Sequence, residues 1–62
     1  MKIMVAGSRG QLGKELIRQL GAERESGLSV VGVDLDSLDI CDESAVFAFC
    51  RREEPDIIVN CA

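Results

Sequence analysis

Three evenly spaced glycines are the residues of this chain whose type and spacing best suit ligand chemistry. Gly7, Gly10 and Gly13 follow the apolar run Ile3–Ala6, and a helical pattern begins at Gln11. A strand, a glycine turn and a helix start present free backbone N–H groups and the positive end of a helix dipole to an anion. The spacing Gly-x-x-Gly-x-x-Gly is one residue longer than the Gly-x-Gly-x-x-Gly form of the dinucleotide fingerprint but follows its logic. We therefore predict that the turn binds a dinucleotide pyrophosphate, with a tight turn that binds nothing as the alternative.

The phosphate loop of nucleoside triphosphatases also combines a glycine turn with a Gly-Lys pair, here Gly13-Lys14. That loop needs four residues between its first glycine and the pair, and then a Ser or Thr that binds magnesium. In this chain five residues separate Gly7 from Gly13, and Glu15 follows Lys14. The spacing and the magnesium ligand are both wrong, so this class is excluded.

An acidic and a basic residue bear on the choice of nucleotide. Asp34 ends the β-branched run 28–33, where a carboxylate can accept hydrogen bonds from an adenosine ribose and would oppose a 2′-phosphate. Arg9 lies in the glycine turn, and its guanidinium could reach a 2′-phosphate. These residues favour opposite cofactors, so the sequence leaves open NADH or NADPH. The structural alternatives are a loop carboxylate at Asp34 and a solvated turn residue at Arg9.

Two later groups also suit a nucleotide site. Asp39 and Ile40 could hold an adenine ring by one hydrogen bond and one apolar face, or serve as a turn residue and a core residue. Asn60, Cys61 and Ala62 end the last apolar run, where small residues would line a nucleotide crevice. Asn60 has the alternative role of satisfying loop backbone.

The alternation of apolar runs and helical patterns predicts an α/β fold with a parallel sheet. Strands are expected at 2–6, 28–34 and 56–62, with a very short one at Leu38–Ile40. Helices are expected from Gln11 to Gly21, with a possible extra turn to Glu25, and from Glu43, capped by Asp42, to about Glu53. The expected apolar stripes are Leu12, Leu16, Ile17 and Leu20 on the first helix, and Val46, Phe49 and Cys50 on the second.

The composition argues against several other classes. The chain has 62 residues, a formal net charge of −4, no histidine and three scattered cysteines, Cys41, Cys50 and Cys61. We expect reduced structural thiols, no metal site and no nucleic-acid partner. No apolar run reaches the roughly 18 residues of a membrane span, so we expect a cytoplasmic protein. Because so small a sheet has open edges and a small core, we expect the isolated chain to be marginally stable or to form homo-oligomers.

Four segments together resemble the extended short-chain dehydrogenase/reductases. They are Val5–Gly13, Val33-Asp34, Leu38–Asp42 and Pro55–Ala62. The strongest resemblance is to the dTDP-4-dehydrorhamnose reductase family, through its Gly-x-x-Gly-Gln-Leu-Gly turn, its Leu-Asp-Ile-x-Asp segment and its Pro-Asp-x-Val-Asn-x-Ala strand. The resemblance covers essentially the whole chain. It implies that residues 1–62 are a partial NAD(P)-binding Rossmann-like domain with sheet order 3-2-1-4 and flanking helices.

The resemblance also implies a cofactor contact for each matching position. The pyrophosphate would be bound by Gly7, Gly10, Gln11, Leu12 and Gly13, the adenosine ribose by Asp34, the adenine by Asp39 and Ile40, and the middle of the cofactor by Cys61 and Ala62. Arg9 stands where asparagine is common in the family.

The implied function is cofactor binding in an NAD(P)H-dependent enzyme that reduces dTDP-4-dehydrorhamnose to dTDP-rhamnose. The family's catalytic Tyr-x-x-x-Lys pair lies far downstream, and this chain has no tyrosine. We therefore expect no catalytic residue in 1–62, and a nucleotide-sugar substrate bound elsewhere in a longer protein. The alternatives are a non-catalytic regulatory subunit of the methionine adenosyltransferase type and another extended family member, such as a sugar epimerase. A Tyr-x-x-x-Lys pair in the full gene would favour the enzyme over the regulatory subunit.

Overall fold

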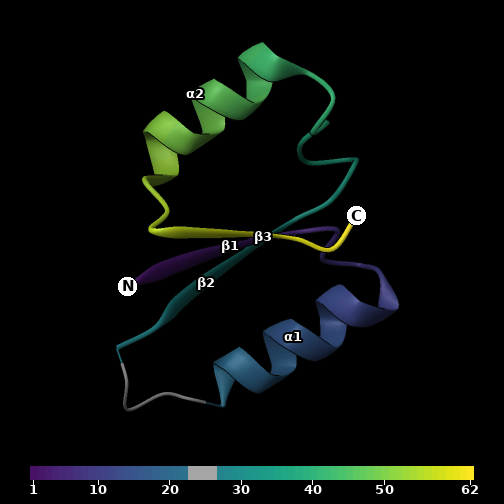
Figure 1. The fold of residues 1–62 in the computed structure, drawn as a ribbon, viewed down its shortest axis with the longest axis vertical. Coiled ribbons are helices and arrows are strands. Elements are labelled where there is room, and N and C mark those ends of the chain that lie inside the picture. Colours follow the sequence, from purple (N-terminus) through teal and green to yellow (C-terminus); the bar gives the residue numbers. More distant parts are fainter. Residues whose placement is uncertain (23–26) are drawn as a thin grey trace.

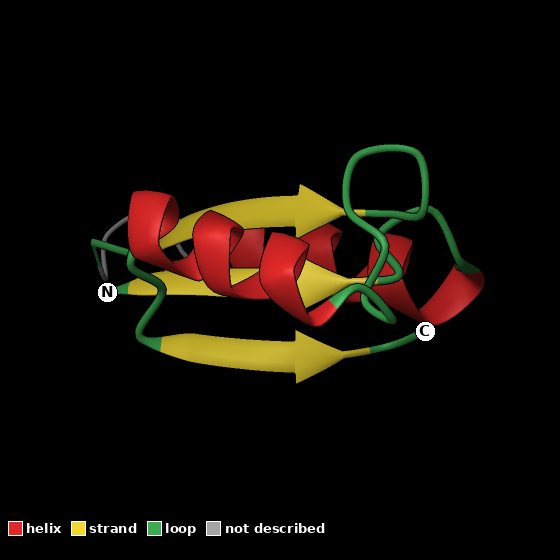
Figure 2. Ribbon diagram, turned by 90° about the horizontal axis from the view of Figure 1, so that it is seen from above, coloured by secondary structure: helices red, strands yellow, loops and turns green. Residues whose placement is uncertain are grey.

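A computed structural model describes residues 1–22 and 27–62 and shows a parallel sheet between two helices. The elements are β1 (Lys2–Ala6), α1 (Gln11–Gly21), β2 (Ser29–Val33), α2 (Glu43–Glu53) and β3 (Ile57–Asn60). The sheet order is β2-β1-β3, and both pairings are parallel. The helices lie on opposite sides of the sheet (Figure 1), and all strands run in the same direction, so their carboxyl ends share one edge (Figure 2). The predicted α/β, Rossmann-like fold is confirmed.

The central strand β1 is buried on both faces. Ile3, Met4, Val5 and Ala6 are at most 7% exposed. Met4 pairs with Val31 of β2 and with Ile58 of β3, which fixes the register on both sides. A continuous apolar run with no polar alternation is what a central parallel strand requires, because helices cover both of its faces.

Helix α1 covers one face of the sheet, close to Gly32 of β2. The half-buried residues of its stripe are Leu16, Ile17 and Leu20, as predicted. The prediction for Leu12 is wrong, because its side chain is 66% exposed. Gly13 is the buried residue of the first turn, so Leu12 falls at the margin of the stripe that contacts the sheet.

Helix α2 covers the other face and has the expected start and stripe. The Asp42 side chain accepts a hydrogen bond from the backbone N–H of Ala45 at 3.1 Å, which caps the helix. Val46, Phe49 and Cys50 pack against a core that includes Met4. The helix ends at a left-handed Glu54, and Pro55 follows. The predicted boundaries, cap and stripe of this helix are confirmed.

The segment between β2 and α2 differs from the prediction of a very short strand. Residues 35–37 and 40–41 form turns, and residues 38 and 39 have no assigned secondary structure, so the described chain has a β2-β1-β3 sheet without that extra edge strand. Leu38 is buried in the core, whereas Ile40 is 40% exposed. The N–H groups of Ser37 and Leu38 both bond to the Asp34 carbonyl, and this turn prevents a strand ladder from forming.

The possible extra turn of the first helix falls largely on residues 23–25, which lie outside the described residues. Within the described ranges, α1 ends at Gly21. No helix in those ranges is long and apolar enough to cross a membrane.

Candidate functional site

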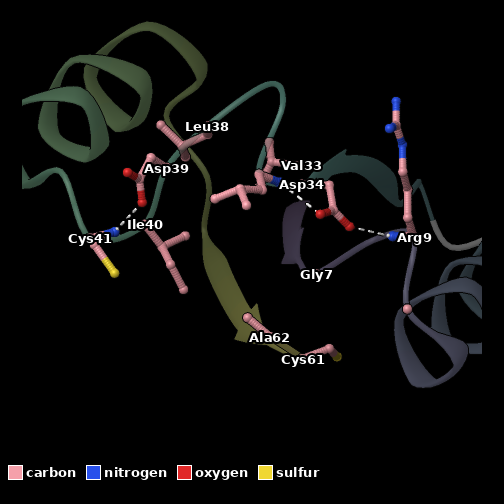
Figure 3. A pocket seen from close by; sticks show the side chains of 12 residues that line it. Gly7, Arg9, Val33, Asp34, Leu38, Asp39, Ile40, Cys41, Cys61 and Ala62 are labelled. Carbon is pink, nitrogen blue, oxygen red and sulfur yellow. Dashed lines mark hydrogen bonds between the residues drawn. The ribbon is translucent and has the colours of Figure 1, made fainter.

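The carboxyl ends of the three strands meet at a cavity of about 620 Å³. Gly7 follows β1, Asp34 follows β2 and Cys61 follows β3, so the three ends supply neighbouring parts of its wall (Figure 3). Ligands of open parallel sheets bind at this edge, at a point where neighbouring connections leave in opposite directions. The lining residues are Gly7, Arg9, Gly10, Val33, Asp34, Leu35, Leu38, Asp39, Ile40, Cys41, Cys61 and Ala62.

The three glycines of the turn have different physical reasons to lack a side chain. Gly7 has a φ of +76°, and a Cβ there would lie 2.7 Å from the backbone nitrogen of Ala62. A Cβ on Gly13 would lie 2.1 Å from the carbonyl oxygen of Gly7. Gly10 has a φ of −70°, and among the described residues its Cβ would approach only that same oxygen, at 3.4 Å. The fold therefore requires Gly7 and Gly13 but leaves room for a side chain at Gly10.

The start of α1 presents unpaired backbone donors. Gly10 is its N-cap in extended conformation and provides no side-chain cap. Within the described chain, the N–H groups of Gln11, Leu12 and Gly13 have no hydrogen-bond acceptor. The first turn of α1 contains no acidic residue. These donors and the helix dipole make this end of α1 suited to an anion.

Asp34 is held by the turns on both sides of it. Its Oδ2 accepts the backbone N–H of Arg9 at 2.8 Å, and its Oδ1 accepts that of Leu35 at 2.7 Å. Figure 3 shows the carboxylate turned toward Arg9. The hydrogen bonds from Leu35 and Arg9, with a smaller effect of the Arg9 charge, lower the pKa of Asp34. The group is thus ionised at neutral pH, and each oxygen retains room for a further donor such as a hydroxyl.

The Arg9 side chain forms an ion pair with a residue that the sequence reasoning missed. Its Nη2 lies 2.7 Å from Oδ2 of Asp36. Both side chains are exposed, so the pair adds little to stability. The sequence shows two nearby acidic residues, Asp34 and Asp36, that could pair with Arg9. The geometry of the turn after β2 decides that Asp36 is the partner of the guanidinium.

Asp39 and Ile40 lie on the wall formed by the loop before α2. The Asp39 Oδ1 accepts the backbone N–H of Cys41 at 2.9 Å. The Asp39 carboxylate is turned to this N–H, while Ile40 leaves the loop in a different direction (Figure 3). Asp39 therefore serves as a turn residue, and its other oxygen remains available to a ligand.

The segment after β3 lies against the glycine turn and completes the wall of the cavity. The Cys61 N–H donates to the Ala6 carbonyl at 2.8 Å, so the segment stays beside β1. The Asn60 Oδ1 accepts the N–H of Ala62 at 3.0 Å. Asn60 thus has the backbone role that was its alternative, and it does not line the cavity, whereas Cys61 and Ala62 do.

The structure brings together most of the residues predicted for the site. Gln11, Leu12 and Gly13 do not line the cavity: Gln11 and Leu12 are exposed at the helix start, and Gly13 is buried against the turn. The lining residues that the sequence reasoning did not include are Val33, Leu35, Leu38 and Cys41. Each is adjacent in sequence to a predicted site residue, and this adjacency was the available signal.

The fold and the glycine turn define a Rossmann-like α/β unit whose strand ends enclose a cavity. The model of the RmlD substrate binding domain family matches residues 1–62. The chain therefore belongs to this family, which confirms the resemblance that the sequence motifs indicated.

Comparisons with individual proteins agree with the family. The chain is 42% identical over 62 residues to a probable dTDP-4,6-dihydroxy-2-methyloxan-3-one 4-ketoreductase of Streptomyces antibioticus, covering 100% of this chain and 20% of that protein. It is 38% identical over 61 residues to the spore coat polysaccharide biosynthesis protein SpsK of Bacillus subtilis, covering 98% of this chain and 20% of that protein.

A solved structure has the same fold at similar identity. It is a dTDP-4-dehydrorhamnose reductase of Clostridium acetobutylicum, with a TM-score of 0.91 and 37% identity. The match covers 100% of this chain and 21% of that one. The chain thus spans about a fifth of the length of the relatives that it matches.

Proposed function

We propose that residues 1–62 are the NAD(P)H-binding part of a cytoplasmic reductase that converts dTDP-4-dehydrorhamnose to dTDP-rhamnose. Membership of the family and the names of two relatives, a 4-ketoreductase and a dTDP-4-dehydrorhamnose reductase, support this reaction. The same names favour a reductase over the regulatory-subunit and epimerase alternatives. The cofactor would supply the hydride, and the sugar would bind outside these residues.

One observation carries the cofactor assignment: the fold does not require a glycine at position 10. In the part of the chain that the structure describes, a Cβ at Gly10 meets only the Gly7 carbonyl oxygen, at ordinary contact distance, and Gly10 lines the cavity beside N–H groups of α1 that have no acceptor there. The absent side chain leaves the backbone at Gly10 open to the cavity, which supports a ligand that approaches this backbone closely. A pyrophosphate is such a ligand, because it needs backbone donors and no intervening Cβ.

The other site residues would then hold the rest of the dinucleotide. The ionised Asp34 carboxylate would accept hydrogen bonds from the adenosine ribose, and Asp39 and Ile40 would flank the adenine. Cys61 and Ala62 would lie near the middle of the cofactor. All five line one cavity, which supports their sharing one ligand. The active protein would be longer than this chain, and residues 1–62 would form part of a single domain of that protein. We expect the longer protein to form homo-oligomers.

The test uses the longer protein that carries this chain. We expect it to oxidise NADH or NADPH when dTDP-4-dehydrorhamnose is added. Gly10→Ala should raise the KM for the cofactor by about tenfold or more, because the new Cβ displaces the pyrophosphate by a fraction of an ångström and tenfold corresponds to only about 1.4 kcal/mol.

Two further variants separate binding from folding. Gly21→Ala places the same methyl group at the other end of α1, where it meets nothing within 4 Å among the described residues, and should leave the KM unchanged. Gly10→Ser adds a good N-cap, so a binding defect in a well-folded Gly10→Ser protein comes from the site. Wild-type cofactor KM values in both Gly10 variants would overturn the assignment of the turn. Cofactor binding without reduction of the sugar would overturn the reaction but not the site.

A further inference from the structure

The ion pair between Arg9 and Asp36 lies at the rim of the cavity: Arg9 lines it together with Asp34, whereas Asp36 is outside the lining. Arg9 is fixed twice: its backbone N–H donates to Asp34, and its guanidinium contacts Asp36 at 2.7 Å. The turn after β2 sets this arrangement, because the N–H groups of Ser37 and Leu38 both bond to the Asp34 carbonyl. Asp36 is thus held two residues beyond the ribose-facing carboxylate and on the same turn.

The charges at this rim sum to a negative value. Asp34 and Asp36 contribute two carboxylates, and Arg9 contributes one guanidinium that is already paired. A ribose 2′-hydroxyl is neutral and can donate to Asp34. A 2′-phosphate is a dianion near neutral pH, so it would meet two like charges and would have to compete with Asp36 for Arg9.

We propose that Asp36 determines the cofactor preference by holding Arg9 away from the 2′-position, so that the site selects NADH over NADPH. This inference rests on the proposed function of the cavity as a dinucleotide site. Figure 3 shows the Arg9 side chain on the Asp34 side of the cavity and directed away from Cys61 and Ala62, so its charge lies at that end. Without Asp36, the Arg9 guanidinium would favour a 2′-phosphate. The ion pair with Asp36 occupies the guanidinium and so weakens this preference.

The exposure of the pair decides the size of the effect. The Arg9 and Asp36 side chains are 70% and 56% exposed, so their attraction is screened and the pair opens readily. Asp36 therefore biases the choice and does not block NADPH. Removing its charge both frees the guanidinium and removes one repulsive carboxylate, and we expect these two effects together to favour NADPH by about tenfold relative to NADH, or about 1.4 kcal/mol.

The experiment measures dissociation constants for NADH and NADPH with the wild-type protein that carries this chain and with four variants: Asp36→Asn, Arg9→Gln, the double variant of these two, and Glu54→Gln. Asp36→Asn should raise the affinity for NADPH relative to NADH by about tenfold. The same substitution in an Arg9→Gln background should give a smaller gain, because no guanidinium is released. Arg9→Gln keeps the backbone N–H that bonds to Asp34, so the turn is retained. Glu54→Gln is the matched control. It also removes one negative charge, but at the C-terminal end of α2 away from the cavity, so it should leave the ratio of NADPH to NADH affinity unchanged.

The outcomes separate this inference from the proposed function. Binding of both cofactors with an unchanged ratio in Asp36→Asn would overturn the role of Asp36 and leave the dinucleotide site standing. An equal gain with and without Arg9 would also overturn it, because simple charge repulsion would then suffice. A wild-type preference for NADPH would contradict the proposed direction. Failure of both cofactors to bind would overturn the site and this inference together.

Discussion

A methyl group added at Gly13 should destabilise the fold, and the same group added at Gly21 of the same helix should not. The Cβ at Gly13 would lie 2.1 Å from the Gly7 carbonyl oxygen, well inside the 3.4–4 Å of ordinary contact. Neither atom can rotate away, because the backbone fixes the position of the Cβ and includes the Gly7 oxygen. Relief requires α1 to move off β1, and overpacking of this kind costs about 3 kcal/mol. At Gly21 the added group meets nothing within 4 Å in residues 1–22 and 27–62, and helix propensity should give a gain of about 0.5 kcal/mol.

The two variants are compared by urea unfolding followed by far-UV circular dichroism, since the chain has no Trp or Tyr for fluorescence. We expect their free energies of unfolding to differ by about 3.5 kcal/mol, a large part of the stability of so small a domain. An osmolyte such as trimethylamine N-oxide extends the folded baseline if Gly13→Ala is largely unfolded. Equal unfolding midpoints for the two variants would refute the argument that Gly13 is required by helix–strand contact.

Two predictions concern carboxylates of the loops. Asp42→Ala removes the side chain that accepts the Ala45 N–H, so urea unfolding should show a loss of about 1 kcal/mol, whereas Asp42→Ser should retain most of the stability; no difference between the two variants would reject the cap. Hydrogen bonds from Leu35 and Arg9 lower the pKa of Asp34 from its ordinary 3.8. The ionised carboxylate therefore contributes its full share to the free energy of unfolding above pH 3.8, and this share is lost as the pH falls through the folded-state pKa. The urea midpoint of Asp34→Asn should therefore fall less than that of the wild type between about pH 5 and about pH 2, and parallel curves would contradict this interpretation.

The elements with strong periodic or capped sequences could be predicted residue by residue. The unbroken run Ile3–Ala6 indicated a strand buried on both faces, and that strand is the centre of the sheet. Helix α2 had a capping aspartate at one end and Pro55 beyond the other, and its boundaries are as predicted. Local chemistry fixes these features, so sequence alone was sufficient.

Features that depend on contacts between distant segments could not be predicted. Leu38 and Ile40 have the spacing of a strand, but Leu38 is buried in the core with Met4 while Ile40 is exposed, and the segment forms no strand. Leu12 fits the apolar stripe of α1, but Gly13 takes the position against the sheet and leaves Leu12 exposed. In both cases tertiary geometry decides between two patterns that the sequence permits.

The site shows the same division between local and distant information. Spacing and position in the turn identified all three glycines, and the structure adds that backbone contacts require Gly7 and Gly13 but not Gly10. The pairing of Arg9 with Asp36 depends on how the turn after β2 lies against the glycine turn, and no local pattern specifies it.

A ¹H–¹⁵N NMR titration with NADH tests most directly whether the cavity at the strand ends binds a dinucleotide. We predict saturable shifts that are largest for the amides of Gln11, Leu12 and Gly13 and for Arg9, whose N–H bonds to Asp34. The amides of Glu53 and Glu54, at the far end of α2, should not move. Shifts confined to that far end, or no shift in the glycine turn of a folded protein at millimolar NADH, would contradict dinucleotide binding at this cavity.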